Sequence, residues 1–557
     1  MNRVIRLAWF VCGGLSGLAA AAGGWADEPP FPPFYHNATP FREAIRTAKT
    51  SALDPPPSGV TVPHHALALD LIAETLALAR GGPYERIVLI SPDHFRRSET
   101  AGAVATRDFL TVLGVVPSDR SASEKLAENS LISVSSLASH EHGFRAILPF
   151  LAEWFPGVPV VTLAVGIRTT QAEWRGLAEA LDPIFTKRTL VIQSTDFSHY
   201  LTAPQAREKD AETLAMLGVG DPDEVVGWNQ PDHVDSKAAQ WLQMTLQRSR
   251  GASLAVVNNR NSIHYAAPGE SVRETTSYVS QVWRREFIPA SALPGKAWYF
   301  GGDFHLGRNL ERYGSDAAAM EFFAERILRH TEGRPLIVNL EGVLTKLPIR
   351  PESLDSMQIV MPTEPTISLL RRGKVAGVIL ANNHTRDLGE EVRAAMIEDL
   401  EAAGIAVIDE GTVVRFPEFD LSSATDVRNR PVPAANLLRA SDFPKHPRLP
   451  GAYRPQFSFL HWGVEYRPGP DERQRWIART AREAGCDLLI GCHSHLPSEG
   501  TTRIEGLLSI PSLGNLLFDQ TQRERGGVLL EVRFFAQGTF ATRVIPVGNL
   551  YREWRGK

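Results

Sequence analysis

Short apolar runs rich in β-branched residues alternate with segments of helical periodicity along this chain of 557 residues. From these runs we expect strands at 85–91, 158–165, 189–193, 297–300, 336–340, 377–380, 457–460, 488–490 and 506–510. The helical patterns predict helices at 67–78, 173–181, 390–403 and 472–484. Alternation of this kind is typical of α/β folds. Because it stops once and then resumes, we expect two α/β domains.

The interruption lies at Phe287–Gly295, a stretch of proline and small residues without periodicity, which we expect to be a linker. It separates a predicted first domain, residues 27–286, from a predicted second domain, residues 296–557. Another stretch, Phe416–Pro455, holds six further prolines after Pro417 and little periodicity. Long loops inside a domain are usually functional or disordered, so we expect this stretch to form a lid over a site in the second domain.

The first 26 residues have the pattern of a secretory signal peptide. Arg3 and Arg6 precede an uncharged run of apolar and small residues, Leu7–Ala22, and the small residues around Trp25 offer a cleavage point. The alternative is an anchor that stays attached, but the run is rich in glycine and falls short of the roughly 20 apolar residues of a spanning helix. We therefore expect a secreted, periplasmic or cell-surface protein with no stable transmembrane segment after cleavage.

Charge and cysteine content argue against nucleic-acid binding and against disulfides. The chain has 59 basic and 63 acidic residues, a formal net charge of −4 and no long basic run, so we expect no nucleic-acid partner. Cys12 lies in the predicted signal peptide. Cys486 and Cys492 flank an expected strand, which at about 3.3 Å per residue holds them roughly 20 Å apart, too far for a disulfide.

Polar residues that can bind metal follow five of the strands expected in the second domain. They are Asp303, His305, Glu341, Asn383, His384, His461, His493 and His495. In open α/β sheets ligands bind at the carboxyl ends of the strands, so these five segments would meet at one edge. Imidazoles with carboxylates and an amide suit Mn, Fe or Zn, and two such ions can act together on one water. A single histidine would be read as a surface or core residue, but five matched placements favour a dinuclear metal site.

Six motifs give this domain a resemblance to a known family. They are Gly302-Asp-Phe-His-Leu-Gly-Arg308, Val338-Asn-Leu-Glu-Gly342, Ala381-Asn-Asn-His-Thr-Arg-Asp-Leu-Gly389, His461-Trp-Gly-Val-Glu465, Gly491-Cys-His-Ser-His495 and Ser512-Leu-Gly-Asn-Leu-Leu-Phe-Asp519. On these motifs, residues 297–520 resemble the CapA family, named for poly-γ-glutamate capsule synthesis, within the calcineurin-like metallophosphoesterases. The resemblance implies a four-layer αββα sandwich.

The same resemblance implies roles for individual residues. One metal would be held by Asp303, His305 and His495 and a second by Asn383, His461 and His493, with Glu341 bridging the two. His384 would be the general acid, and Arg308 would face an anionic substrate. Asn515 would orient ligands or serve a turn. His305 departs from many family members, which have a non-ligand there, and it makes the site resemble a complete phosphoesterase.

A second set of such residues follows expected strands of the first domain. The set is His64, His94, His142, Asp196 and His199. Histidines grouped with a carboxylate could bind non-haem iron, copper or zinc.

The first domain also resembles a known family, through Val62-Pro-His-His65, Ile90-Ser-Pro-Asp-His94, Glu141-His-Gly-Phe-Arg-Ala-Ile-Leu-Pro-Phe-Leu151, Ser194-Thr-Asp-Phe-Ser-His-Tyr200 and Thr275-Thr-Ser-Tyr-Val279. Residues 50–285 resemble the Memo family, which includes protein B of the AmmeMemoRadiSam system. The resemblance implies a fold like that of class III extradiol dioxygenases, with the five residues of the set facing one pocket. A cysteine that family members contribute late in the domain is missing, because the corresponding stretch reads Val257-Asn-Asn-Arg-Asn-Ser262. Two alternatives stay open: a bound metal, or a scaffold that serves as a binding module.

These patterns favour an exported metal-dependent hydrolase of the phosphoesterase type, acting on a cell-envelope or capsule polymer or its precursor. Its partner would be that polymer or a small anionic substrate. A first alternative is a non-catalytic factor for polymer assembly or export, in which the metal-type residues can change with little loss. A second is a metal-dependent oxidoreductase centred on the Memo-like domain, with iron or copper bound there.

Overall fold

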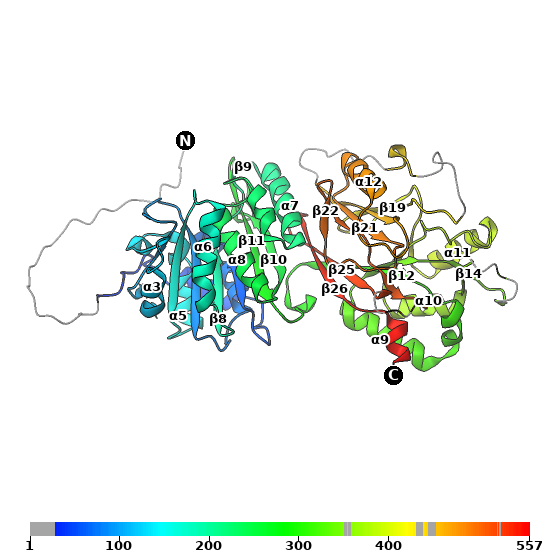
Figure 1. Ribbon diagram of the computed structural model, residues 1–557, viewed down its shortest axis with the longest axis horizontal. Coiled ribbons are helices and arrows are strands. Elements are labelled where there is room, and N and C mark those ends of the chain that lie inside the picture. Colours follow the sequence, from blue (N-terminus) through cyan, green and yellow to red (C-terminus); the bar gives the residue numbers. More distant parts are fainter. Residues whose placement is uncertain are drawn as a thin grey trace, which may run out of the picture.

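The computed structural model describes residues 28–349, 354, 358–429, 438–443, 453–520, 522 and 525–556. The predicted signal peptide, residues 1–26, and Cys12 lie outside the described residues. Figure 1 shows two α/β halves along the long axis of the molecule, the first coloured blue to green and the second green to red. The predicted α/β class is confirmed. Among the described residues, no helix combines the length and the apolar character needed to cross a membrane.

The first half is built on a nine-stranded sheet of order β10-β11-β1-β8-β2-β7-β3-β6, with β9 paired to β11. Its strands are β1 Gly59–Val62, β2 Arg86–Asp93, β3 Gly102–Val104, β6 Ile132–Val134, β7 Val160–Gly166, β8 Thr189–Ser194, β9 His199–Leu201, β10 Ser253–Asn261 and β11 Thr275–Arg284. The four central strands β1, β8, β2 and β7 run parallel. A hairpin of β4 Phe109–Thr111 and β5 Gly114–Val116 lies outside this sheet. Parallel strands are buried on both faces, which explains why they read as continuous apolar runs.

Helices cover both faces of this sheet. They are α1 Thr39–Thr47, α2 Leu69–Ala77, α3 Arg120–Leu126, α4 His142–Arg145, α5 Leu148–Trp154, α6 Gln171–Leu181, α7 Ala203–Val219 and α8 Lys237–Ser249. One hydrophobic cluster joins the sheet to α1, α2 and α5, and a second joins its other face to α3, α6, α7 and α8. Residue Thr170 starts α6 with a capping box to Glu173, which satisfies backbone N–H groups of the first turn.

The second half contains two larger sheets. The seven-stranded sheet has the order β17-β16-β13-β12-β25-β26, with β24 paired to β12, and the six-stranded sheet has the order β18-β19-β20-β21-β23-β22. The strands of the first are β12 Lys296–Phe304, β13 Leu336–Leu340, β16 Val375–Ile379, β17 Ala406–Ile408, β24 Asn515–Leu517, β25 Val528–Phe534 and β26 Phe540–Pro546. Those of the second are β18 Val413–Arg415, β19 Asp420–Thr425, β20 Gln456–His461, β21 Leu488–Cys492, β22 Thr502–Ile504 and β23 Leu507–Ile510. A short parallel pair is formed by β14 Val343–Thr345 and β15 Val360–Pro362.

Hydrophobic clusters define four layers in this half. Its helices are α9 Ala317–Thr331, α10 Thr363–Arg372, α11 Glu390–Ala402, α12 Glu472–Glu483 and α13 Leu550–Arg555. One cluster packs α9, α10, α11 and α13 on the seven-stranded sheet, and another packs α12 on the six-stranded sheet. The third, with Phe300, Phe419 and Phe457, fills the space between the two sheets. This is the αββα order of layers that the family resemblance implies.

The predicted lid is wrong for part of its length. Residues 420–425 form β19, which pairs in parallel with β20, and Phe416 and Phe419 are buried between the two sheets. The strand was missed because polar residues such as Ser422 and Ser423 interrupt its apolar pattern, although both side chains are buried and hydrogen-bonded. Residues 430–437 and 444–452 of the predicted lid lie outside the described part of the chain.

The two halves meet where the β25–β26 hairpin reaches the first half, next to α7 (Figure 1). Gln537 donates to Asp210 Oδ2 and to Asn259 Oδ1, both at 2.9 Å, and Thr539 donates to Asn259 Oδ1 at 2.5 Å. Phe535 belongs to the hydrophobic cluster on the α7 face of the first half. The hairpin therefore provides both polar and apolar contacts between the halves.

Candidate metal centres

The predicted ligands of the second half lie at the carboxyl ends of strands in its two facing sheets. Asp303 is the penultimate residue of β12, and Glu341 directly follows β13. In the other sheet His461 ends β20, and His493 directly follows β21. Because β12 and β13 run parallel, and β20 and β21 do too, their chain direction brings these side chains to shared edges.

A first group of possible ligands consists of Asp303, Glu341 and His495, whose ligand atoms all lie within 4.8 Å of one another. His495 Nδ1 is 3.1 Å from Asp303 Oδ2 and 2.8 Å from Asn515 Oδ1. All four side chains are buried. An imidazole between two carboxylates is a donor set suited to a divalent metal of the Mn, Fe or Zn type.

A second group shares Asp303 and adds His461 and Cys492. The His461 ring lies 4.6 Å from that of His493, between centroids. His461 Nδ1 is 3.2 Å from Cys492 Sγ, while its Nε2 is buried without a partner among the described residues. Asp303 is thus the residue common to both groups.

Buried polar atoms without a hydrogen-bond partner are concentrated at this edge. Within the described part of the chain they include both ring nitrogens of His305, Glu341 Oε2, Asn383 Oδ1, His461 Nε2 and His493 Nδ1. Leaving a buried polar group unsatisfied costs about 1–3 kcal/mol, so such a concentration calls for a ligand. Oxygen and imidazole nitrogen atoms of this kind fit divalent metal ions.

The protonation of these histidines follows from burial and from neighbouring charge. Burial, reinforced by the Arg308 guanidinium, lowers the pKa of His305 to about 3. Burial and the neighbouring His495 lower the pKa of His493 to about 4, and burial with the neighbouring His493 lowers the pKa of His461 well below its usual range. These three imidazoles are therefore neutral at pH 7 and keep a lone pair available for a metal.

On the carboxylate side of the site the pKa values are raised instead. Burial disfavours a charged His495, but the Glu341 and Asp303 carboxylates outweigh it and raise the pKa of His495 to about 9. Burial and the Asp303 charge raise the pKa of Glu341 well above its usual range. Without metal, protons stabilise this cluster, and a bound cation would replace them.

Backbone strain accompanies the segment that carries His493 and His495. Both residues have positive φ values, 94° and 58°. For residues other than glycine such conformations cost roughly 1–3 kcal/mol and persist only where the surroundings enforce them. Here the strained turn after β21 brings two imidazoles to the site within three residues.

His384 lies beside this cluster with a partner of its own. Its Nδ1 is 2.8 Å from Asp387 Oδ2, its backbone N–H donates to Asn382 Oδ1, and its side chain is buried. His384 also lies close enough to His461 and His493 for its charge to contribute to the lowered pKa of each. Pairing at Nδ1 leaves Nε2 as the atom that can exchange a proton with a substrate.

Asn383 faces the last described residue before the 430–437 gap. Its side-chain amide donates to Asn429 Oδ1, and Asn429 donates in turn to the Asn383 carbonyl. The remaining Asn383 Oδ1 is one of the unpartnered atoms. The segment that follows β19 thus contacts the site through Asn429.

Arg308, which was predicted to face a substrate anion, already has a carboxylate partner. Its guanidinium forms an ion pair with Asp519, which also accepts from Asn309, and it lies over the Phe518 ring at 5.3 Å from the centroid. The Asp519 carboxylate, 211 residues further along the chain, would therefore compete with a substrate anion for Arg308.

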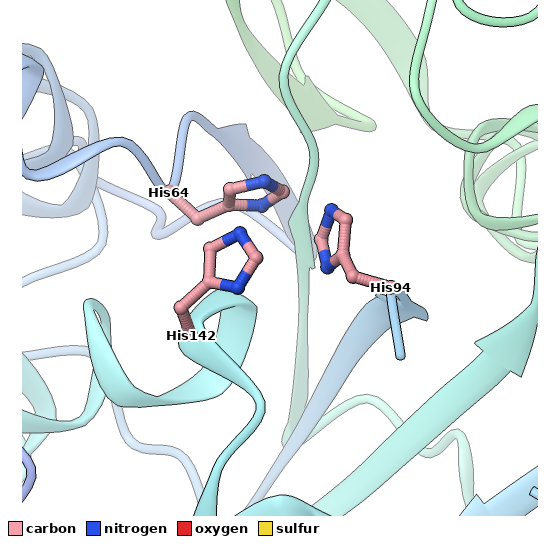
Figure 2. A group of neighbouring side chains, drawn as sticks. All are labelled: His64, His94 and His142. Carbon is pink, nitrogen blue, oxygen red and sulfur yellow. The ribbon is translucent and has the colours of Figure 1, made fainter. Parts of the chain in front are cut away.

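In the first half, His64, His94 and His142 come together. His64 lies just after β1, His94 just after β2, and His142 begins α4. Figure 2 shows the three rings turned toward one another. Their centroids are 4.8 Å apart for His64 and His94, 5.0 Å for His64 and His142, and 4.2 Å for His94 and His142. Each offers a nitrogen within 4.8 Å of the others, so the group could hold a metal ion.

Three buried carboxylates border these rings. His94 Nδ1 is 2.8 Å from Glu141 Oε1, and His64 Nε2 is 3.2 Å from Asp235 Oδ2 and 3.7 Å from Asp196 Oδ2. Burial opposes a charged imidazole, but hydrogen bonds to Asp235 and Glu141 outweigh it and raise the pKa of His94 to about 10. Burial and the neighbouring imidazoles lower the pKa of His142 to about 4.

His199 lies outside this group of three histidines. Its Nδ1 is 3.3 Å from Thr276 Oγ1, and its ring is next to that of Tyr200. It begins β9, which pairs with the first residues of β11. That His199 faces the same pocket stays a prediction.

The stretch 257–262, where a family cysteine was expected, lies in β10 and the turn that follows. Its Asn259 donates to Asp210 Oδ2 and to the Tyr278 carbonyl, and it accepts from the β25–β26 hairpin. This stretch therefore serves the contact between the halves.

Three neighbours of the two sites were not among the predicted site residues. Cys492, Asp387 and Asp235 contact His461, His384 and His64. Cys492 and Asp387 belong to the motifs that carry the predicted ligands, so their position in those motifs could have identified them as site residues. Asp235 follows no predicted strand, and nothing in the local pattern identifies it.

Comparison with known proteins supports the division into two parts. Residues 57–282 match the family model described as Memo-like protein, and residues 458–520 match that of the bacterial capsule synthesis protein PGA_cap. A PGA biosynthesis protein CapA from Bacillus subtilis is 38% identical over 88 residues, which are 16% of this chain and 23% of that protein.

Two further relatives cover longer segments. A MEMO1 family protein from Methanopyrus kandleri is 28% identical over 28% of this chain and 59% of its own length. A capsule biosynthesis protein CapA from Bacillus anthracis is 23% identical over 44% of this chain and 66% of its own length. The chain therefore spans less than two thirds of each of these curated relatives. It combines a Memo-like domain with a CapA-like domain of the PGA_cap type.

Proposed function

We propose that this protein is an exported, metal-dependent hydrolase of the phosphoesterase type, whose CapA-like domain acts on a cell-envelope or capsule polymer or on its precursor. The observation that carries the proposal is the set of buried, unpartnered oxygen and nitrogen atoms on Glu341, His461 and His493, next to the buried Asp303 carboxylate. The names of the CapA relatives support the link to a capsule polymer. The apolar start of the chain supports export.

The residues divide into two ligand groups around Asp303. Asp303, Glu341, His305 and His495 would hold one divalent ion, and His461, His493 and Asn383 would complete a second position next to it. Two bound ions of the Mn, Fe or Zn type would polarise a phosphoryl oxygen and supply a nucleophilic water near neutral pH. Carboxylates and neutral imidazoles in a buried setting match this requirement.

His384 is the proposed general acid. Its Nδ1 is paired with Asp387, which orients the ring. The proton on Nε2 would then pass to the leaving oxygen of the substrate, and a later water would restore it. Unlike His461, His384 belongs to neither of the two groups of possible ligands around Asp303.

Hydrolysis of bis(4-nitrophenyl) phosphate by residues 28–557 tests the proposal, with Mn²⁺ supplied and then removed by a chelator. We expect release of nitrophenol that chelation abolishes and fresh Mn²⁺ restores. Asp303→Asn should reduce the rate strongly, because Asp303 belongs to both ligand groups. Asp399→Asn is the matched control, since Asp399 is on α11 and pairs with Lys346. Equal rates for both variants would contradict a catalytic metal site at Asp303.

A further inference from the structure

Arg145 is a buried arginine that has no carboxylate partner among the described residues. It is the last residue of α4 and is only 2% exposed. Its Nη2 donates to the Pro32 carbonyl, while its Nε and Nη1 are buried without any hydrogen-bond partner in the described part of the chain. Three of its five N–H groups, those on Nε and Nη1, therefore have nothing to donate to.

The other buried arginines of the described residues each have an acidic partner. These pairs are Arg284 with Glu286, Arg393 with Asp409 and Arg533 with Glu531. Taking a charged group out of water costs several kcal/mol unless an opposite charge compensates. Arg145 is thus the exception in a fold that otherwise neutralises its buried guanidinium groups.

The neighbours of this guanidinium do not supply the missing negative charge. Burial lowers the pKa of Arg145 to about 10, which leaves the group charged at pH 7. Burial raises the pKa of Tyr35 to about 12, so its phenol is neutral there. The Phe109 ring, whose centroid is 5.7 Å from Arg145 Cζ, offers a cation–π contact but no net charge. Compensation therefore calls for a bound anion.

Arg145 lines a small pocket that can hold such an anion. The walls come from residues 34–35, from residues 110–112 of the β4–β5 hairpin and from residues 148–149 at the start of α5. Its volume is about 10 Å³, which is roughly the space that one water-sized group occupies. Phe34 and Leu110 are each 39% exposed, so the pocket lies near the surface and an ion can enter from solvent.

The lining of the pocket selects the class of anion. Apart from Arg145, Tyr35 and Thr111, the side chains that line it are apolar. Burying an ion in such surroundings costs more as its charge rises, so a monovalent ion is favoured over phosphate or sulfate. The small volume also favours a compact ion over an organic acid.

We propose that Arg145 and this pocket bind one small monovalent anion of the chloride type, which accepts from the N–H groups of Nε and Nη1. Hydrogen bonds between a guanidinium and an anion are charge-assisted and strong. The ion would hold together residues 34–35, the β4–β5 hairpin and α4, the helix that begins with His142. This site does not rest on the proposed hydrolase function.

Chloride binding in solution is measured on residues 27–557, the chain without the predicted signal peptide. The chloride NMR line broadens when the ion exchanges onto a slowly tumbling protein, and methanesulfonate, which is too large for the pocket, keeps the ionic strength constant. We expect a saturable broadening that bromide reverses. Arg145→Met should remove the saturable part. Arg175→Met, which removes an exposed arginine of α6, is the matched control and should keep it.

Crystals of the same chain soaked in sodium bromide give a readout that needs no variant. Anomalous scattering from bromine should show a peak within hydrogen-bonding distance of Arg145 Nε or Nη1. Absence of that peak, or a protein carboxylate against Arg145 in its place, would overturn the proposal. Absence of saturable chloride binding in solution would overturn it too, as would binding that Arg145→Met leaves unchanged. None of these outcomes depends on hydrolysis by the second half.

Discussion

Metal binding by the CapA-like domain should depend steeply on pH, and the direction follows from His495. In the metal-free protein the Glu341 and Asp303 carboxylates hold the pKa of His495 at about 9, although burial opposes the charged form. A histidine must be neutral to bind a metal, so below pH 9 each metal that binds at His495 displaces a proton. Affinity should therefore rise as the pH rises toward 9.

The size of the effect follows from one displaced proton. Apparent affinity should increase about tenfold per pH unit well below the pKa and less steeply near it, which between pH 7 and pH 9 amounts to about 50-fold, or about 2.3 kcal/mol. The raised pKa of Glu341 acts in the same direction, because this carboxyl group must also lose a proton before it can bind.

Calorimetric titration with Mn²⁺ measures this slope on residues 28–557 carrying His64→Ala, which removes a ligand from the other site. Buffers with different heats of ionisation report the number of protons released. His330→Gln is a matched control with an unrelated histidine at the end of α9, and it should keep the full pH dependence. An affinity that stays constant between pH 7 and pH 9, with no protons released, would refute the assignment of His495 as a ligand.

Three other predictions concern single side chains. His384→Ala should lower turnover of the phosphodiester by about 10²–10⁴ and leave the metal content from elemental analysis unchanged, whereas equal loss of metal would make His384 a ligand. The pKa of about 3 for folded His305, against about 6.5 in the unfolded chain, means that its stabilising effect above pH 6.5 is lost as the pH falls toward 3. His305→Gln should therefore flatten the urea-measured loss of stability between pH 6.5 and pH 5 by up to about 1.4 kcal/mol per unit, and an unchanged slope would contradict this pKa. Gln537→Ala removes donors to the buried Asp210 and to Asn259 and should destabilise the chain by about 1–3 kcal/mol in urea unfolding; a change below about 0.5 kcal/mol would show that the hairpin contact contributes little.

The arrangement of the CapA-like site was predictable because it depends on strand direction. Asp303 and His461 lie at the carboxyl ends of strands that each have a parallel neighbour, and residues at such ends share an edge of the sheet irrespective of loop conformation. The buried parallel strands were likewise visible as apolar runs. By contrast, α8 carries buried glutamines that bond to strands beneath it, so its sequence lacks a clear apolar stripe.

Contacts set by irregular segments could not be predicted. Asp235 reaches His64 from a loop, and its partner Asp196 lies 39 residues earlier in the chain. Arg308 looked available for an anion because the sequence does not reveal its pairing with Asp519. In both cases the decisive neighbour is distant in sequence and follows no periodic pattern, so only the folded arrangement identifies it.

Metal stoichiometry of residues 28–557 carrying His64→Ala and His94→Ala tests the central claim most directly, because these changes leave the CapA-like site as the place for tight binding. Elemental analysis after reconstitution should find about two equivalents of Mn, Fe or Zn per chain. Adding His461→Gln should remove at least one of them, and the phosphodiester hydrolysis should be lost with it. Absence of bound metal after reconstitution, together with absence of hydrolysis, would contradict the account and favour a non-catalytic role in polymer assembly.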